Sequence, residues 1–259
     1  MTQTFYKYQG TGNDFVIIDN RSLKFNKANI TLITKLCDRR FGIGADGLIL
    51  LENHDTADFK MVYFNADGKE SSMCGNGGRC ITAFAKFLGI VSNTATFEAI
   101  DGMHIAEIEG DLVKLQMKDV STIENHQTHL FLDTGSPHHV QMVSDLEALD
   151  VKHNGSTIRH GHPYNEAGSN VNFVNKISDT EFGVRTYERG VEDETFSCGT
   201  GVTAVALAMH NSGQTTAETI TLQTPGGELK VNYLPSENGY TSIWLIGPAK
   251  QVFKGDVPC

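Results

Sequence analysis

The sequence predicts an α+β protein of two pseudo-symmetric lobes, each a mostly antiparallel β-structure around a central helix. The first observation behind this prediction is an internal repeat. Cys74-Gly-Asn-Gly and Cys198-Gly-Thr-Gly lie 124 residues apart, and Gly89 has a counterpart at the same spacing in Gly213. The second observation is an apolar stretch of helical spacing after each cysteine. The third is that short runs of β-branched or alternating residues fill much of the remaining chain.

Helices are predicted at three places. Residues 29–38 carry apolar side chains along one side of a helix. The stretch from Cys74 to Leu88 ends with apolar residues at positions i, i+3, i+4 and i+7, and the stretch after Cys198 repeats this spacing. A glycine follows each stretch as the expected C-cap. The second helix is apolar nearly all round over residues 203–209, so it should be buried on most sides.

Strands and lobe boundaries follow from the same patterns. After each long helix we expect a strand, a turn at Gly102 or Gly226, and another strand. The polar segment 119–128 is the predicted boundary, which divides the chain into lobes 1–119 and 120–259 of normal domain size. Strands are also predicted before the first long helix, over residues 4–8, 15–19, 48–51 and 59–65.

Composition excludes several classes of protein. The net charge of −10 argues against nucleic acid or an anionic membrane surface as a partner. The N-terminus lacks the apolar segment of a signal peptide, and no apolar run reaches the ~18 residues of a membrane-spanning helix. Five cysteines, an odd number without a disulfide-like spacing, favour a reducing cytoplasm. Without a Cys-x-x-Cys or His-x-x-x-His pair, no metal site is expected.

Cys74 and Cys198 are the candidate catalytic residues. A thiol reacts as thiolate, and a helix N-terminus stabilises that anion. The glycines after each cysteine let backbone N–H groups approach a bound α-carboxylate. One such thiol alone would more often be a buried structural cysteine, but two in matched positions predict thiols that face each other across a cleft. That is the chemistry of a two-base racemase or epimerase. Cys37 and Cys80 are predicted core residues, and Cys259 has no assigned role.

Other candidates carry weaker signals. Glu188 and Arg189 form either a surface ion pair or, in a cleft, a clamp for a carboxylate. His138 follows Thr134-Gly-Ser136, which matches Thr11-Gly-Asn13 at a spacing of 123. An imidazole at this place would adjust the pKa of a thiol. The glycine-rich segments 9–15 and 39–47 lack the phosphate-binding motifs and are interpreted as turns.

These segments together resemble the diaminopimelate epimerase family, nearly from end to end. The resemblance implies a cofactor-independent enzyme with Cys74 and Cys198 as base and acid and with His138 and Glu188 as modulators of their pKa values. The segments that carry it are Gly10-Thr-Gly-Asn-Asp-Phe15, Phe41-Gly-Ile-Gly-Ala-Asp-Gly47, Asn65-Ala-Asp-Gly68, Met73-Cys-Gly-Asn-Gly-Gly-Arg-Cys80, Asn170-Val-Asn-Phe-Val174, Glu188-Arg-Gly190 and Cys198-Gly-Thr-Gly201.

The resemblance also implies which residues bind substrate. Two positions depart from the family pattern: many members have Asn where this chain has Ser136, and some have Gln where it has Gly47. These departures concern substrate preference rather than reaction type. The implied substrate contacts are Asn13, Asn65, Asn170, Glu188 and Arg189 at the distal amino-acid end, Ser136 in the turn before His138, and Gly75, Asn76, Gly199 and Thr200 around the reacting carbon.

The expected function is therefore epimerisation of LL- and meso-diaminopimelate, with that small molecule as the partner and no cofactor. A homodimer is left open. A related amino-acid racemase, similar to proline racemase, is the alternative within the class, although proline lacks the second head group that the Glu188–Arg189 clamp would suit. From another class, an amino-acid-binding protein with redox-sensing cysteines remains as an alternative.

Overall fold

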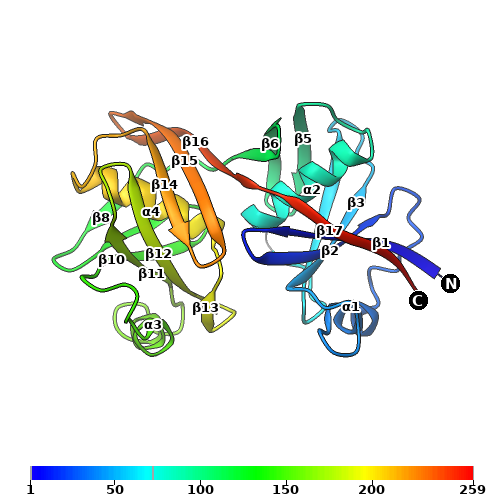
Figure 1. Ribbon diagram of the computed structural model, residues 1–259, viewed down its shortest axis with the longest axis horizontal. Helices are drawn as coiled ribbons and strands as arrows, with labels where there is room; N and C mark the ends of the chain where they lie inside the picture. The colour runs from blue at the N-terminus through cyan, green and yellow to red at the C-terminus, as the bar shows by residue number, and fades with distance from the viewer. Residues whose placement is uncertain (1, 72, 259) are drawn as a thin grey trace. The chain divides into compact units, whose positions relative to one another are not determined.

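The computed structural model describes residues 2–71 and 73–258, which form two compact units (Figure 1). Unit 1 comprises residues 1–115 and 247–259, and unit 2 comprises residues 116–246. The predicted division into 1–119 and 120–259 therefore needs one correction, because the last segment of the chain belongs with the first unit. Cys259 lies outside the described residues. No helix within the described residues is both long and apolar enough to cross a membrane.

Unit 1 is a curved, mostly antiparallel sheet with two helices. Its strands pair in the spatial order β17-β1-β2-β3-β4-β5-β6-β7, with parallel pairs only at β2–β3 and β4–β5. The elements are β1 (Thr2–Gly10), β2 (Asn13–Asp19), α1 (Ile30–Cys37), β3 (Gly47–Glu52), β4 (Phe59–Asn65), α2 (Gly75–Phe87), β5 (Thr94–Ala99), β6 (Gly102–Glu109), β7 (Leu112–Gln116) and β17 (Lys250–Pro258).

Unit 2 repeats this arrangement. Its strands pair in the order β8-β9-β10-β11-β12-β14-β15-β16, with parallel pairs at β10–β11 and β12–β14. A short extra strand, β13, pairs with the end of β12. The elements are β8 (Ile123–Asn125), β9 (Leu130–Asp133), β10 (Pro137–Met142), α3 (Val151–His160), β11 (Asn170–Lys176), β12 (Glu181–Glu188), β13 (Asp193–Thr195), α4 (Gly199–Asn211), β14 (Thr219–Thr224), β15 (Gly227–Ser236) and β16 (Gly239–Pro248).

The two pairing orders confirm the internal duplication, because each step and each strand direction matches. In unit 2 the first position of the order is filled by β8, which precedes β9 in the chain. In unit 1 the same position is filled by β17, which pairs with β1 from Thr2–Pro258 to Gln9–Lys250. This pairing covers an edge of the sheet that would otherwise expose its backbone hydrogen-bonding groups.

One predicted turn shifts by a residue. Gly102 opens β6 with a φ of 120°, and its counterpart in unit 2 is Gly227, which opens β15 with a φ of 126°. Each lies opposite the last residue of the preceding strand, Ala99 or Thr224. The glycine that corresponds to Gly102 in the structure is therefore Gly227, one residue after the Gly226 that the sequence repeat indicates.

The two long helices lie at the centre of their units, as predicted. Helix α2 contacts β1, β2, β3, β4, β6 and β17, and helix α4 contacts β9, β10, β11, β12, β14 and β15. Every residue of α4 from Val202 to Met209 is fully buried, which confirms the expected burial on most sides. Each helix is followed by a glycine with a φ of 71°, Gly89 or Gly213, in the conformation expected of a C-terminal stop.

The short helices show where sequence patterns suffice and where they fail. Helix α1 falls within the predicted 29–38, and the side chain of Asn29 caps it by accepting a hydrogen bond from the Leu32 N–H at 3.1 Å. Helix α3, the counterpart of α1 in unit 2, was not predicted. Its buried residues are Val151 and Gly155 alone, too few to give a helical apolar pattern.

Gly155 gives the packing of α3 a direct test. A Cβ at this position would collide with the side chain of Tyr187 on β12. We expect Gly155→Ala to lower the free energy of unfolding by about 1–3 kcal/mol, because the contact leaves no room for another atom. Urea titration measures this change. The neighbouring substitution Ser156→Ala is the control and should stay within about 0.5 kcal/mol of the parent chain. Equal stability of both variants would mean that α3 does not pack closely on Tyr187.

Candidate active site

Cys74 is the N-cap residue of α2. Its backbone is extended, with φ −97° and ψ 125°, and its carbonyl accepts the first helical hydrogen bond from the Gly78 N–H at 2.7 Å. Glycines at positions 75, 77 and 78 and Asn76 make up the first turn. This geometry places a thiol beside backbone N–H groups that have no acceptor within the helix. The positive end of the helix dipole favours an anion there, either the thiolate or a carboxylate.

Asn13 contacts both Cys74 and Asn76. Its Oδ1 lies 3.4 Å from the Cys74 Sγ and 3.3 Å from the Asn76 Nδ2, and its Nδ2 donates to the Asp46 carboxylate at 2.6 Å. Because a carboxylate can only accept from Asn13, the amide orientation is fixed and its oxygen faces the thiol. These four residues (Asn13, Asp46, Cys74, Asn76) are called the Cys74 cluster below. A protonated Cys74 can donate to Asn13 Oδ1.

An ion network holds Asn13 in place. Arg39 pairs with Asp14 and with Asp46, both at 2.7 Å, and Lys7 pairs with Asp14 at 2.7 Å. Burial alone would raise the pKa of Asp14, but hydrogen bonds and charges from Arg39 and Lys7 outweigh it and hold this pKa at about 2. The glycine-rich spacing of residues 39–47 predicts a turn but does not reveal this role. The sequence does contain a sign of the ion network, because Arg39 and Asp46 flank the glycines of this segment.

Two further positions in unit 1 bear on the predicted contacts. Asn65 ends β4, is exposed, and lies opposite Gly47 in the β3–β4 pair. Gly47 is required by packing, since a Cβ there would lie 2.5 Å from the Phe64 carbonyl oxygen and from the Tyr63 ring.

Cys198 occupies the same place on α4 as Cys74 on α2. It is the N-cap, with φ −120° and ψ 114°, and it is 8% exposed. Its Sγ lies 3.4 Å from the Thr200 Oγ1, and the Thr200 carbonyl accepts from the Thr134 hydroxyl at 2.9 Å. These three residues (Thr134, Cys198, Thr200) form the Cys198 cluster. Gly201 is required here, because a Cβ would lie 3.3 Å from the Cys198 Sγ and 2.5 Å from the Asn172 Oδ1.

His138, on β10, is fully buried and neutral. Asn172 Nδ2 lies 3.1 Å from His138 Nδ1 and 3.0 Å from the His139 carbonyl oxygen, while Asn172 Oδ1 accepts from the Thr186 hydroxyl at 3.0 Å. This pattern fixes the amide orientation, so Nδ1 accepts and the ring proton sits on Nε2. Burial, reinforced by the positive charge of Arg189, lowers the pKa of His138 to about 3. Nε2 has no hydrogen-bond partner among the described residues, so it is available to donate to a ligand.

Asn172 is the residue in this part of unit 2 that sequence analysis did not single out. Asn170 and Asn172 lie two residues apart on β11, so their side chains point to the same face of the sheet. This spacing is visible in the sequence. Asn170 is itself engaged within the protein. It donates to the Pro137 carbonyl at 3.1 Å and accepts from the Arg189 N–H at 2.9 Å. It thus ties the His138 turn to the end of β12, which carries Glu188.

The predicted clamp residues lie at the end of β12. Glu188 is its last residue and is half-buried, and Arg189 follows it and is exposed. The Arg189 Nη1 donates to the Ala167 carbonyl at 3.0 Å, which leaves other guanidinium donors for a carboxylate. Ser136, half-buried, lies in the turn between β9 and β10, where its carbonyl accepts from the Thr134 N–H at 3.2 Å.

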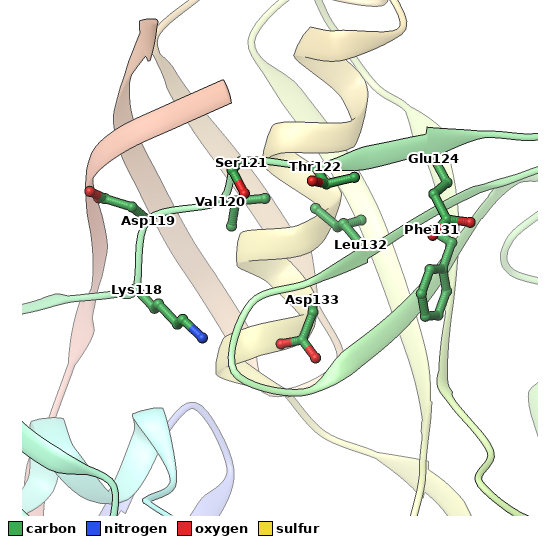
Figure 2. Close-up of a pocket in the computed structure, with 9 residues that line it drawn as sticks. All are labelled: Lys118, Asp119, Val120, Ser121, Thr122, Glu124, Phe131, Leu132 and Asp133. Carbon is green, nitrogen blue, oxygen red and sulfur yellow. The ribbon is translucent and has the colours of Figure 1, made fainter. Parts of the chain in front are cut away.

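A separate hollow on unit 2 contains neither cysteine (Figure 2). Figure 2 shows that its residues come from the segment before β8 and from β8 and β9. It shares no residue with the predicted site, so it is not a candidate for the reaction. Its lining residues are Lys118, Asp119, Val120, Ser121, Thr122, Glu124, Phe131, Leu132 and Asp133.

The fold is shared with solved structures of other proteins. A phenazine biosynthesis protein of the PhzF family from Bacillus anthracis superposes with a TM-score of 0.80 over 100% of both chains, at 13% sequence identity. A hydroxyproline epimerase from Agrobacterium vitis superposes with a TM-score of 0.70 over 99% of this chain and 92% of that one, at 14% identity. The chain thus has the duplicated α+β fold of the PhzF and proline racemase-like proteins.

Sequence comparison specifies the family. The family model described as diaminopimelate epimerase matches residues 5–123 and 130–252. A diaminopimelate epimerase from Flavobacterium psychrophilum is 58% identical over 250 residues, which cover 96% of this chain and 98% of that protein. One from Chlorobaculum tepidum is 42% identical over 258 residues, with 96% and 98% covered. The chain belongs to the diaminopimelate epimerase family.

The state of His138 predicts a pH dependence. Its native pKa of about 3 lies below the ~6.5 of an unfolded histidine, so below pH 6.5 the unfolded chain takes up a proton that the native protein cannot. Its contribution to stability is therefore lost progressively as pH falls from about 6.5 to about 3. In ¹⁵N-imidazole NMR spectra, the His138 signals should stay those of a neutral ring between pH 8 and pH 5 and should titrate near 6.5 in denaturant. Native-state titration near pH 6.5 would contradict the buried, neutral assignment.

Proposed function

We propose that this chain, a diaminopimelate epimerase, interconverts the LL and meso forms of diaminopimelate by proton exchange at one α-carbon, with Cys74 and Cys198 as the acid–base pair and no cofactor. The observation that carries the proposal is a cysteine at the N-cap of both central helices. Family membership supplies the reaction and the substrate. The paired cysteines supply the chemistry, since inversion requires one group to remove a proton and another to deliver one to the opposite face of the carbon.

The reaction leaves charge balanced. One thiolate takes the α-proton and becomes a thiol, while the other thiol gives its proton to the carbon and becomes a thiolate. The reverse direction exchanges the two roles. Negative charge that develops on the α-carboxylate during proton removal is stabilised by helix N–H groups, such as those of Gly75 and Asn76 or of Gly199 and Thr200. A general acid or base of this kind contributes about 100-fold to 10,000-fold to the rate.

The remaining predicted residues bind substrate in this proposal. His138 acts as a neutral donor through Nε2 rather than as a cation, because its imidazole stays uncharged at working pH. We assign the distal amino-acid group to Asn13, Asn65, Asn170, Glu188 and Arg189, with Ser136 close by. Asn170 contributes by holding the Arg189 backbone, and Arg189 contributes guanidinium donors that suit a carboxylate. We assign two roles to Glu188: it binds the substrate ammonium group, and it modulates the pKa values of the two thiols.

The cellular compartment and the oligomeric state of the protein are also part of the proposal. Cysteine usage supports a reducing cytoplasm as the compartment, since catalysis needs thiols rather than a disulfide. Gel filtration would establish whether the chain forms a homodimer.

The cysteine assignment is tested by substitution. Cys74→Ala and Cys198→Ala should each lower kcat for LL-diaminopimelate by about 100-fold or more, because each removes one proton-transferring group. The measurement is incorporation of solvent deuterium at the α-carbon, followed by chiral separation. Cys37→Ala is the control; it lies in the core of unit 1 and should affect stability but not kcat. Deuterium incorporation without inversion in a variant would mean that the remaining thiol still exchanges the proton on its own side of the carbon, as a two-base mechanism allows. Near-normal epimerisation by either variant would remove that cysteine from the reaction.

The distal clamp is tested by Arg189→Lys. A planar guanidinium can donate two parallel hydrogen bonds to a carboxylate, and an ammonium cannot. A charged hydrogen bond is worth about 1.5–3 kcal/mol, so KM should rise about tenfold to a hundredfold. Exposed Arg40→Lys is the matched control and should leave KM unchanged. Lysine and proline should be poor substrates of the parent enzyme, since neither carries a distal carboxylate. Turnover of either at the rate of diaminopimelate would overturn the assignment of the clamp and the choice of substrate.

A further inference from the structure

The clamp residues Glu188 and Arg189 open a tight turn. The Glu192 N–H donates to the Glu188 carbonyl at 2.8 Å and closes this turn over residues 188–192. Within it Gly190 has a φ of 94° and Glu192 a φ of 60°. A left-handed backbone suits glycine but is unfavourable for a residue with a side chain. The conformation of Glu192 is therefore strained, and it persists only where the surroundings stabilise it.

The carboxylate of Glu192 makes the contacts that stabilise this turn. Its Oε1 accepts from the Gly190 N–H at 3.0 Å, and its Oε2 accepts from the Tyr187 hydroxyl at 3.1 Å. The Nε and Nη2 atoms of Arg159 lie 3.2 and 3.1 Å from Oε1, and the His160 Nε2 lies 3.2 Å from Oε2. These contacts take up the acceptor capacity of both oxygens, so the carboxylate is engaged within the protein.

Glu192 is negatively charged in this arrangement. Burial alone would raise the pKa of Glu192, but hydrogen bonds from Gly190 and Tyr187 and the charge of Arg159 outweigh it and lower this pKa. The contact with Arg159 is therefore a charge-assisted hydrogen bond, the stronger kind.

Arg159 joins the turn to a second segment. It lies near the end of α3, and its side chain is 12% exposed. Its Nη1 donates to the Asn165 carbonyl at 3.4 Å, in the loop between α3 and β11. A Cβ on Gly168 would collide with its guanidinium, so this loop packs directly against Arg159. One guanidinium thus contacts both the 188–192 turn and the 161–169 loop.

Arg189 is held by the same two segments. Its backbone belongs to the turn, where its N–H donates to the Asn170 Oδ1 at 2.9 Å. Its Nη1 donates to the Ala167 carbonyl in the loop at 3.0 Å. An arginine side chain loses rotamer freedom when it binds a carboxylate, and a side chain that is already ordered loses less. Contacts that hold both segments in place therefore favour substrate binding.

We propose that Glu192 and Arg159 are positioning residues that fix Arg189 in the orientation in which it binds the distal carboxylate of the substrate. The inference rests on the proposed role of Arg189 as the clamp. Both residues act on the reaction only through Arg189, since the oxygens of Glu192 are already engaged and Arg159 is bound to Glu192. Their effect should be on KM rather than on kcat, because the two thiols are not altered.

Glu192→Gly tests the inference directly, because glycine adopts the left-handed backbone without strain and only the carboxylate is lost. KM for LL-diaminopimelate should rise about threefold to tenfold, which is the cost of ordering one long side chain on binding, while kcat stays within about twofold. Arg159→Met should raise KM to a similar extent. Lys152→Met is the matched control and should leave KM unchanged, since Lys152 also lies on α3 but pairs with Asp193 at 2.6 Å, outside the turn.

A double variant shows whether the effect passes through Arg189. In the Arg189→Lys background, Glu192→Gly should change KM by less than about twofold, because the guanidinium on which it acts is already absent. Amide hydrogen exchange gives a readout that needs no turnover. The Arg189 N–H bonds to Asn170 and not to Glu192, so faster exchange at this amide in Glu192→Gly reports a looser clamp.

The possible outcomes separate the inference from the proposed function. Unchanged KM and unchanged exchange in Glu192→Gly, a fall in kcat at constant KM, or an equal rise of KM in Lys152→Met would each overturn the inference alone. A further threefold to tenfold rise in the Arg189→Lys background would also overturn it, because Glu192 would then act without Arg189. Unchanged KM in Arg189→Lys itself would overturn the clamp of the proposed function. If circular dichroism shows that Arg159→Met does not fold, Glu192→Gly decides.

Discussion

The candidate site depends on one constraint: a cysteine must stand at the N-cap of a helix that cannot fray. At both Cys74 and Cys198 the extended cap conformation places the cysteine at the helix end, where the first backbone N–H groups have no acceptor within the helix. Burial of α2 and α4 against six strands each keeps those N–H groups fixed. Preorganised donors of this kind need no reorganisation when charge develops on a substrate, and this is their main advantage for catalysis.

The duplication supplies two copies of that geometry, and differences in side chains then make the copies unequal. Asn13 beside Cys74 corresponds to Ser136 in the other unit, and Arg79 corresponds to Thr203. Unit 1 buries the guanidinium of Arg79 on the helix that its cysteine caps. Unit 2 instead contains a buried imidazole, that of His138, which its surroundings keep neutral.

Two elements show why sequence patterns gave only part of the fold. Helix α3 fully buries only Val151 and Gly155, and it packs on β11, β12 and β13. Asp150 caps it by accepting from the His153 N–H at 2.9 Å. Strand β17 is mostly exposed and lacks apolar alternation, and its pairing with β1 joins residues about 250 positions apart in the chain. Neither a local contact with one glycine nor a pairing over the whole chain leaves a periodic signal in sequence.

The sequence by itself determined the repeat, the central helices, the two candidate thiols and the family, because these depend on local spacing and on residue identity. The tertiary structure decided how those residues behave. Only the fold shows that Asp46 orients Asn13, that Asn172 fixes the tautomer of His138, and that Arg79 is fully buried. Protonation and hydrogen-bond direction depend on burial and on neighbours from distant parts of the chain, and these exist only after folding.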